Sequence, residues 1–239
     1  MKKLLLLGAI VTLASAATTD RAEYMFFNRH LNRTWLDSAY NLLAQLHTAD
    51  PKDEHCLYLW SRIHLQKGDD AKTKAEKLTY FGGAKALAET LIALNNKNDQ
   101  GHCWWGVAQG RIGQTRGVLN SLFMVSGLKK AFGRALELNP KHPTALDAMG
   151  VLYYELPGFA GGNLDLSEKY FKRSIESDPG YTLARLDLAK LYIKQKRWLA
   201  ARAQLDALLA TTDPKYPGDT ELDDKPEARQ LLKQIEGKE

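Results

Sequence analysis

Apolar residues recur along this chain with the spacing of amphipathic helices, and this pattern itself repeats four times. Each copy contains a position that stops a helix, and these positions are Pro51, Asn96, Pro140 and Pro179. Small or apolar residues stand eight and five residues before each of them, which places them on one helix face. A proline ends the preceding helix and the next helix starts shortly afterwards. The pattern therefore predicts a series of helix pairs.

A small residue lies ten positions after each stop, and a large apolar residue precedes it. The four segments read ADPKDEHCLYLWS (49–61), LNNKNDQGHCWWG (94–106), LNPKHPTALDAMG (138–150) and SDPGYTLARLDLA (177–189). Small residues let two helices approach closely, so each of these positions predicts a helix crossing. We therefore expect Gly150→Leu, which overpacks a crossing, to damage the fold more than Gly162→Leu in a loop.

The segment YTLARLDLAKLYIKQKRWLAARAQLDALLATTDP (181–214) resembles the tetratricopeptide-repeat family, and the resemblance extends over nearly all of the chain after residue 16. It implies an all-α, tetratricopeptide-like solenoid of helical hairpins with about four irregular repeats. The first three stops are 45, 44 and 39 residues from the next stop, whereas this repeat has a period of about 34 residues. The excess falls in 67–83, 110–127 and 156–166, where we expect enlarged loops between the two helices of a repeat.

The N-terminus predicts export. A short basic start, an apolar run over residues 4–13 and the small-residue motif ASA at 14–16 form a secretory signal peptide. The chain is therefore expected to be periplasmic or secreted, and no stable membrane anchor is predicted. The expected division is a signal peptide (1–16), lead helices (17–50), repeats (51–214), and an acidic loop with a C-terminal capping helix (215–239).

A narrower resemblance covers the third and fourth repeats. The segment LPGFAGGN (156–163), with its Pro-Gly and Gly-Gly pairs between two repeat helices, resembles the T component of tripartite ATP-independent periplasmic (TRAP) transporter systems. That group is related in pattern to eukaryotic regulators of microtubule dynamics. The resemblance implies an exported helical protein that binds a periplasmic solute-binding protein and forms a homo-oligomer, a trimer, around an apolar channel.

Composition and motifs exclude several classes. The net charge of +5 is too mild to predict nucleic acid binding. No motif of a protease, hydrolase or nucleotide-binding loop is present, so we expect no enzyme activity, no cofactor and no metal. Cys56 and Cys103 are either two buried thiols or a disulfide.

Seven residues on the first helices of the repeats are expected to line an inner groove. They are Tyr58, Arg62, Arg111, Asp147, Tyr154, Lys190 and Lys194. Four of the seven are basic, so the groove is either a solvated polar face or a site for an acidic or carboxylate-bearing partner. On the second interpretation, charge reversal of Arg111 and Lys190 weakens binding and leaves stability nearly unchanged.

Three aromatic residues are alternative contacts. The repeat pattern places Trp105 in the core and leaves Trp104 for a neighbouring helix or a ligand, while Phe123 and Phe159 lie in the expected insertions. Phe159 either belongs to an elongated turn or contacts a ligand or subunit. The predicted function is an exported protein-binding module associated with solute transport. The alternative is a soluble carrier that encloses an apolar ligand such as a lipid or fatty acid.

Overall fold

The computed structural model describes residues 18–238, apart from the side chains of residues 118–121, and every regular element within them is helical. Residues 18–27 form a first helix. The longer elements that follow are α2 (Trp35–Ala49), α3 (Glu54–Asp70), α4 (Lys74–Leu94), α5 (Asp99–Arg116), α6 (Val118–Leu138), α7 (Pro143–Glu155), α8 (Leu164–Ser177), α9 (Thr182–Lys194), α10 (Trp198–Leu209) and α12 (Lys225–Gln234). The predicted signal peptide lies outside the described residues.

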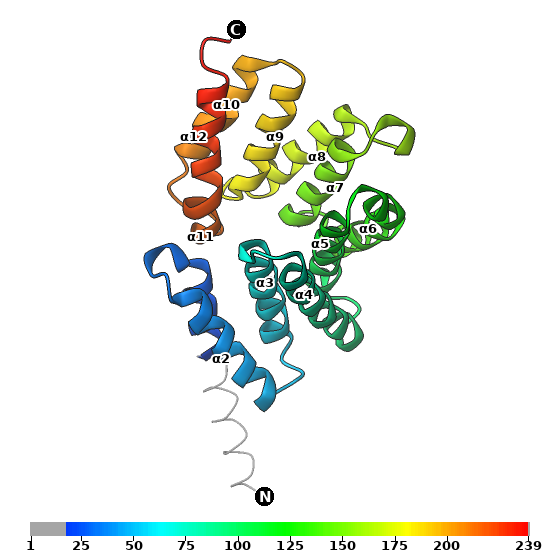
Figure 1. Cartoon of the computed structure of the whole chain (residues 1–239), viewed down its shortest axis with the longest axis vertical. Helices are drawn as coiled ribbons and strands as arrows, with labels where there is room; N and C mark the ends of the chain where they lie inside the picture. Colours follow the sequence, from blue (N-terminus) through cyan, green and yellow to red (C-terminus); the bar gives the residue numbers. More distant parts are fainter. Residues whose placement is uncertain (1–17, 239) are drawn as a thin grey trace, which may run out of the picture.

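The helices pack as consecutive antiparallel hairpins, in which α3 pairs with α4, α5 with α6, α7 with α8, and α9 with α10. Figure 1 shows these pairs following one another around an arc, so that the first and last segments approach each other. The predicted all-α solenoid of helical hairpins is confirmed. No helix in the described range is both long and apolar enough to cross a lipid bilayer.

The predicted crossings lie where the two helices of a repeat touch. A Cβ atom added at Gly106 would lie 2.5 Å from the ring of Phe132, and one at Gly150 would lie 2.5 Å from the ring of Phe171. Ser61 fills the same position in the first repeat, and its hydroxyl donates to the backbone carbonyl of Ala84 at 2.9 Å. The aromatic ring of the second helix therefore occupies the space that the glycine leaves.

The extra residues of the first two repeats lengthen helices, not loops, so the expected enlarged loops at 67–83 and 110–127 are wrong. Helices α3 and α4 have 17 and 21 residues, against 13 and 12 for α9 and α10. Thr73 and Glu76 start α4 with a capping box, in which each side chain bonds to the other residue's backbone N–H. The single residue Gly117, with φ of 111°, separates α5 from α6.

The connection of the third repeat is an ordered turn around η2 (Gly158–Ala160). Gly161 has φ of 89°, a conformation that glycine adopts without strain. The side chain of Asn163 caps α8 by accepting from the backbone N–H of Leu166. A Cβ atom at Gly162 would collide with the carbonyl oxygen of Leu156. The expectation that Gly162 tolerates a side chain far better than Gly150 therefore fails, because the turn leaves no room for one.

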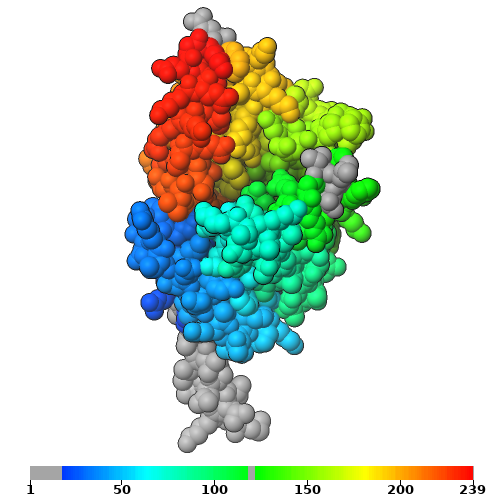
Figure 2. Space-filling view, in the orientation of Figure 1, coloured from blue at the N-terminus to red at the C-terminus, as the bar shows by residue number. Residues whose placement is uncertain are grey.

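The C-terminal segment runs through α11 (Pro217–Asp219) and the π-helical turn η3 (Thr220–Asp224) into α12. Helix α12 packs on α10 through the buried Ala228, and Ile235 just beyond it is also buried. The same segment contacts η1 (Arg29–Leu31), close to the start of the described chain. In Figure 2 the N-terminal and C-terminal segments lie directly against each other. The C-terminal segment thus both caps the last repeat and closes the arc.

Candidate functional site

The arc surrounds a partly open cavity of about 980 Å³. Its wall comes from the inner faces of α3, α5, α7 and α9, which are the first helices of the four repeats, together with α6 and the C-terminal segment. The side chains of one face of a helix recur every three or four residues, so each first helix contributes about one residue per turn. Every repeat therefore contributes to one continuous interior.

The structure brings most of the predicted groove residues to this cavity. Arg62, Arg111, Asp147, Tyr154 and Lys190 line it, and so does Trp104. Tyr58 lies outside the lining but its hydroxyl accepts from Arg62 at 3.4 Å. Lys194 is exposed at the end of α9, where its ammonium lies 4.2 Å from the ring centroid of Tyr154. Their role in binding remains a proposal.

Arg62 is enclosed by aromatic rings. Only 5% of the residue is exposed, and its guanidinium carbon lies 3.9 Å from the ring centroid of Tyr216 and 4.6 Å from that of Trp104. Phe26 and Phe27 supply two further rings at 5.2 and 4.8 Å. Cations over aromatic faces are stabilised most when they are desolvated. The guanidinium of Arg62 is therefore occupied by contacts within the chain and is not free to bind a partner.

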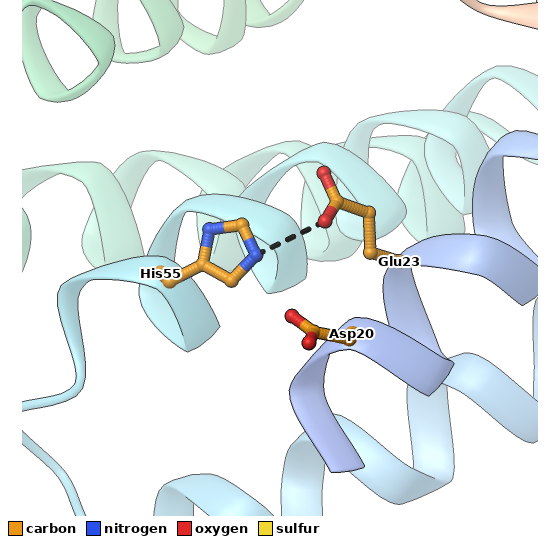
Figure 3. A group of neighbouring side chains, drawn as sticks. All are labelled: Asp20, Glu23 and His55. Atoms are coloured by element: carbon orange, nitrogen blue, oxygen red, sulfur yellow. Dashed lines mark hydrogen bonds and ion pairs between the residues drawn. The ribbon is translucent and has the colours of Figure 1, made fainter. Parts of the chain in front are cut away.

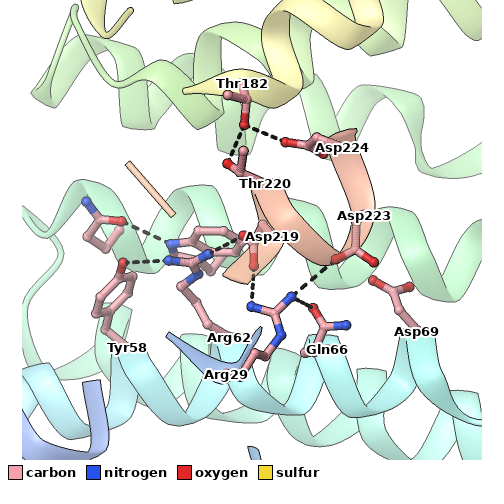
Figure 4. A network of polar contacts seen from close by, with 12 residues as sticks. Arg29, Tyr58, Arg62, Gln66, Asp69, Thr182, Asp219, Thr220, Asp223 and Asp224 are labelled. Atoms are coloured by element: carbon pink, nitrogen blue, oxygen red, sulfur yellow. Dashed lines mark hydrogen bonds and ion pairs between the residues drawn. The ribbon is translucent and has the colours of Figure 1, made fainter. Parts of the chain in front are cut away.

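Asp219 links this cation to the other end of the chain. It accepts from Arg29 at 2.5 Å and from Arg62 at 3.2 Å, and Arg29 also pairs with Asp223 at 3.2 Å. Figure 4 shows the two arginines from the N-terminal half converging on this acidic turn, where Arg29 also donates to Gln66. We call Arg29, Arg62, Tyr216, Asp219 and Asp223 the clasp.

Sequence reasoning missed the clasp except for Arg62. Its partners are separated by more than 150 residues, as in the pairing of Arg62 with Asp219, and no local periodicity connects them. The acidic character of residues 215–239 was a signal, but from the sequence alone it predicts an acidic loop before a capping helix.

The predicted basic character of the groove is wrong for the cavity as a whole. Nine carboxylates line it against three cations, since the C-terminal segment adds four acidic side chains: Asp219, Asp223, Asp224 and Glu227. The three cations are also paired. Arg62 binds Asp219, Arg111 pairs with Asp69 at 3.3 Å, and Lys190 pairs with Asp187 at 3.2 Å and Glu227 at 3.0 Å. The interior therefore favours a cationic group over an acidic one.

Burial and mutual repulsion raise the proton affinity of these carboxylates. Burial raises the pKa of Asp224 to about 7, although a hydrogen bond from Thr182 at 2.6 Å works in the opposite direction. The pKa of Asp147 lies well above its ordinary value, because the group is buried and faces Asp187 and Asp224. Desolvation disfavours an ionised carboxylate unless a positive charge accompanies it.

Part of the cavity lining is apolar. Side chains of α6 and α7 contribute to it, among them Met124, Val125, Leu128, Val151 and Leu152. The cavity therefore combines acidic and apolar lining, which suits a ligand that has both a cationic and an apolar part.

The three aromatic candidates separate in the structure. Trp104 is 8% exposed and packs over Arg62, whereas Trp105 is only half-buried and donates to Glu89 at 3.0 Å. The assignment of Trp105 to the core was therefore wrong, because α5 turns Trp104 toward the cavity. Phe123 and Phe159 are 87% and 90% exposed and lie outside the cavity lining.

One cluster in the described range has the composition of a metal site. Asp20, Glu23 and His55 place one ligand atom each within 4.8 Å of one another, and His55 pairs with Glu23 at 3.3 Å (Figure 3). That ion pair, which is the first cause of the raised pKa of His55, accounts for the cluster without an ion. Cys56 and Cys103 are both buried and unbridged, and burial raises the pKa of the Cys56 thiol to about 12, so neither is a ready metal ligand.

Solved structures similar to this chain are tetratricopeptide-repeat proteins. One from Thermus thermophilus aligns with a TM-score of 0.64 at 17% identity and covers 89% of this chain and 97% of its own. Another, from Parabacteroides merdae, aligns with a TM-score of 0.54 at 18% identity and covers 95% and 79%. The profile of the tetratricopeptide repeat matches residues 159–216. The chain therefore has the helical-repeat fold of the tetratricopeptide-repeat proteins.

Curated relatives point to one group within that fold. Regulator of microtubule dynamics protein 1 of Bos taurus is 28% identical over 214 residues, which are 80% of this chain and 65% of the relative. The protein of the same name from Mus musculus is 25% identical over 215 residues, 82% and 68%. The chain thus spans about two thirds of the length of these relatives, or slightly less.

These relatives overturn the predicted location. They are mammalian proteins named for microtubule dynamics, and mammalian cells have no periplasm, so the prediction of a periplasmic or secreted protein is contradicted. The resemblance to the TRAP component is not shown, whereas the eukaryotic regulators of microtubule dynamics, the group related to it in pattern, do match. The profile of regulator of microtubule dynamics protein 1-3 covers residues 25–159, more than half of the sequence, and the chain therefore belongs to this family.

Proposed function

We propose that this chain is a protein-interaction module that holds a segment of a partner protein inside the cavity enclosed by its repeats. The carrying observation is the lining itself: all four first helices and the C-terminal segment present side chains to one interior of about 980 Å³. Concave surfaces of helical repeats are the usual binding surfaces of such arrays. The polar residues of this interior provide orientation and the apolar ones provide contact area.

A photo-crosslinking residue tests this proposal. It is placed at Ala148, which lines the cavity, and as a control at Leu199, which is 73% exposed on the outer helix α10. The proposal expects a discrete protein adduct from position 148 in cells and none from position 199. Equal adducts from both positions, or no protein adduct from position 148, contradict it.

The family name supplies the first partners to examine. We propose that the partner belongs to the machinery of microtubule dynamics, a proposal that rests on membership of the family. Tubulin polymerisation followed by turbidity, with and without the chain, tests it. Unchanged polymerisation, together with cross-links only to proteins unconnected with microtubules, counts against it. The predicted solute-binding partner requires instead that such a protein appear among the cross-links.

The apolar side chains of the cavity lining support a second candidate, the carrier of an apolar ligand. Met124, Leu128 and Leu152 line a wall that could cover an aliphatic chain. Native mass spectrometry of the purified chain, followed by solvent extraction, tests this function. A bound lipid or fatty acid at near-stoichiometric amount supports it, and an empty protein that still cross-links to a partner at position 148 excludes it.

A further inference from the structure

Asp147 has an unusual position in the cavity. It lies on the inner face of α7, lines the cavity and is 3% exposed. Its Oδ1 atom is buried and has no hydrogen-bond partner among the described residues. A buried polar atom without a partner costs free energy, and a buried unpaired carboxylate costs more. Such a group in a cavity points to a ligand that supplies the missing partner.

The neighbouring acidic side chains, in contrast, have partners. Asp187 and Glu227 share the ammonium of Lys190, at 3.2 and 3.0 Å. Asp224 accepts from Thr182 at 2.6 Å. Both Asp187 and Asp224 face Asp147 and repel its negative charge. The ammonium of Lys190 also attracts Asp147, but its two ion pairs are with Asp187 and Glu227, and the buried Oδ1 atom of Asp147 is left without a hydrogen-bond partner among the described residues.

We propose that Asp147 is the anchor for a cationic side chain, a lysine or an arginine, of the partner segment that enters the cavity. This inference rests on the proposed function, since it names the chemistry by which the partner is recognised. Asp187 and Asp224 add to the negative potential around that side chain. A charge-assisted hydrogen bond to Asp147 would satisfy the atom that has none.

Charge selects this class of ligand over two others. Lys190 holds an ammonium group beside the same carboxylates, so a divalent metal ion would meet a positive charge at close range, whereas a single side-chain cation meets less repulsion. A zwitterionic lipid headgroup would bring its phosphate next to Asp187 and Asp224. A lysine or arginine side chain brings only positive charge.

The surroundings also predict the residues beside the cation. Val151 lies one turn further along α7 and Leu183 lies at the start of α9, and both line the cavity with Tyr154. A cationic residue flanked by apolar residues therefore fits the site, because its neighbours would cover apolar wall while its charge reaches Asp147.

Short peptides test the proposal directly. The probe is acetyl-Gly-Leu-Lys-Leu-Gly-amide, and the controls carry norleucine or glutamate in place of lysine. Calorimetric titration of the full chain should show that the lysine peptide binds about tenfold or more tightly than the norleucine peptide and that the glutamate peptide binds worst. Equal affinity of the lysine and norleucine peptides would overturn the proposal.

Two variants assign the effect to the residue. Asp147→Asn keeps the shape and removes the charge, so the preference for lysine over norleucine should disappear while Tm stays equal or rises. Asp206→Asn, an exposed carboxylate of α10 outside the cavity, should keep the full preference. A fall in Tm of the Asp147→Asn variant, or an undiminished preference for lysine, would show that the carboxylate has another role.

Cross-linking from position 148 and the peptide titrations together distinguish a failure of this inference from a failure of the proposed interaction module. Partner cross-links from position 148 that persist in Asp147→Asn with unchanged affinity refute the anchor and leave the interaction module intact. Binding of the lysine peptide without any protein cross-link refutes the module and leaves the cation site. Dihexanoylphosphatidylcholine that binds where the lysine peptide does not would assign the site to a lipid and overturn the proposal.

Discussion

Helix α7 carries two residues, Asp147 and Gly150, that lie three positions apart and have different kinds of surroundings. Gly150 faces α8, where Phe171 fills the space above it. Asp147 faces the cavity, where its Oδ1 atom has no partner among the described residues. The first position is fixed by packing within one repeat and recurs in the other repeats, while the second depends on residues of α9 and the C-terminal segment. Gly150 thus belongs to the packing face of α7, which recurs in the other repeats. Asp147 belongs to the cavity face, whose surroundings are particular to this repeat.

The clasp should give the largest loss of stability, because it joins segments that the repeats do not connect. Arg62→Ala removes a buried cation and leaves Asp219 with Arg29 alone. Removing one partner of a buried ion pair costs about 3–5 kcal/mol. Arg111→Ala, which removes a half-exposed arginine of the same cavity, should cost less than about 1 kcal/mol. Urea unfolding of both variants measures the difference, and equal losses would mean that the clasp contributes nothing special.

Overpacking of the helix crossing at Gly150 should give the second largest loss of stability. Gly150→Leu forces a side chain into the ring of Phe171, and overpacking of this kind costs about 1–3 kcal/mol or more. Gly158→Leu is the matched control, since a Cβ atom there meets nothing within 4 Å. Thermal melts compare the two. A Gly158 variant as unstable as the Gly150 variant would contradict the packing described for the crossing.

Substitution of Asp147, the residue without a partner, should have a smaller effect on stability, and the size of this effect should depend on pH. The folded-state pKa of Asp147 lies well above its ordinary value, first because of burial, so between the two values the folded state binds the proton that the unfolded state has released. Stability is then lost as pH rises through this range, and Asp147→Asn removes that loss. The titratable groups that face Asp147 are Cys103, Tyr181, Asp187, Lys190 and Asp224, and they are the same in the variant and the parent chain.

The measurement is the Tm of Asp147→Asn minus that of the parent chain, followed from about pH 4, near the ordinary aspartate pKa of 3.8, to mildly alkaline pH. We expect a difference near zero at the acidic end and a positive difference that grows with pH. Asp206→Asn should give a flat line. A negative difference at the alkaline end would mean that the ionised carboxylate has a stabilising partner in the folded protein.

The exposed aromatic residues should give the smallest effect on stability. Phe123→Asp and Phe159→Asp change side chains that are 87% and 90% exposed, and such surface substitutions stay within about 0.5 kcal/mol. If either variant nevertheless loses partner cross-links from position 148, the apolar surface and not the cavity provides the contact. Retained cross-links would keep the cavity as the site.

Local periodicity was sufficient to predict the fold but not the interior. The spacing of Gly106 and Gly150 from the helix stops identified the crossings, because both helices of a repeat are close in sequence. The pair Thr73 and Glu76 also carried the capping signal that starts α4, which would have replaced the expected loop with a longer helix.

The charge of the cavity could not be derived in the same way. Arg62 counts as a free cation in the sequence, and only the folded chain reveals that Asp219 and four aromatic rings enclose it. The prediction for Lys190 fails for the same reason: charge reversal there would place a carboxylate against Asp187 and Glu227, so stability would not stay unchanged.

The closure of the arc changes how the array should come apart. In an open solenoid each repeat contacts only its neighbours, so the ends fray first and unfolding spreads inward. Here Phe27 stacks on Tyr216 and Arg29 pairs with Asp219, so the start of the described chain is joined to the segment that follows the last hairpin. Fraying at one end must therefore break contacts with the other end. The described repeats should unfold as one cooperative unit. In hydrogen exchange, amides of both terminal helices should then be among the slowest to exchange.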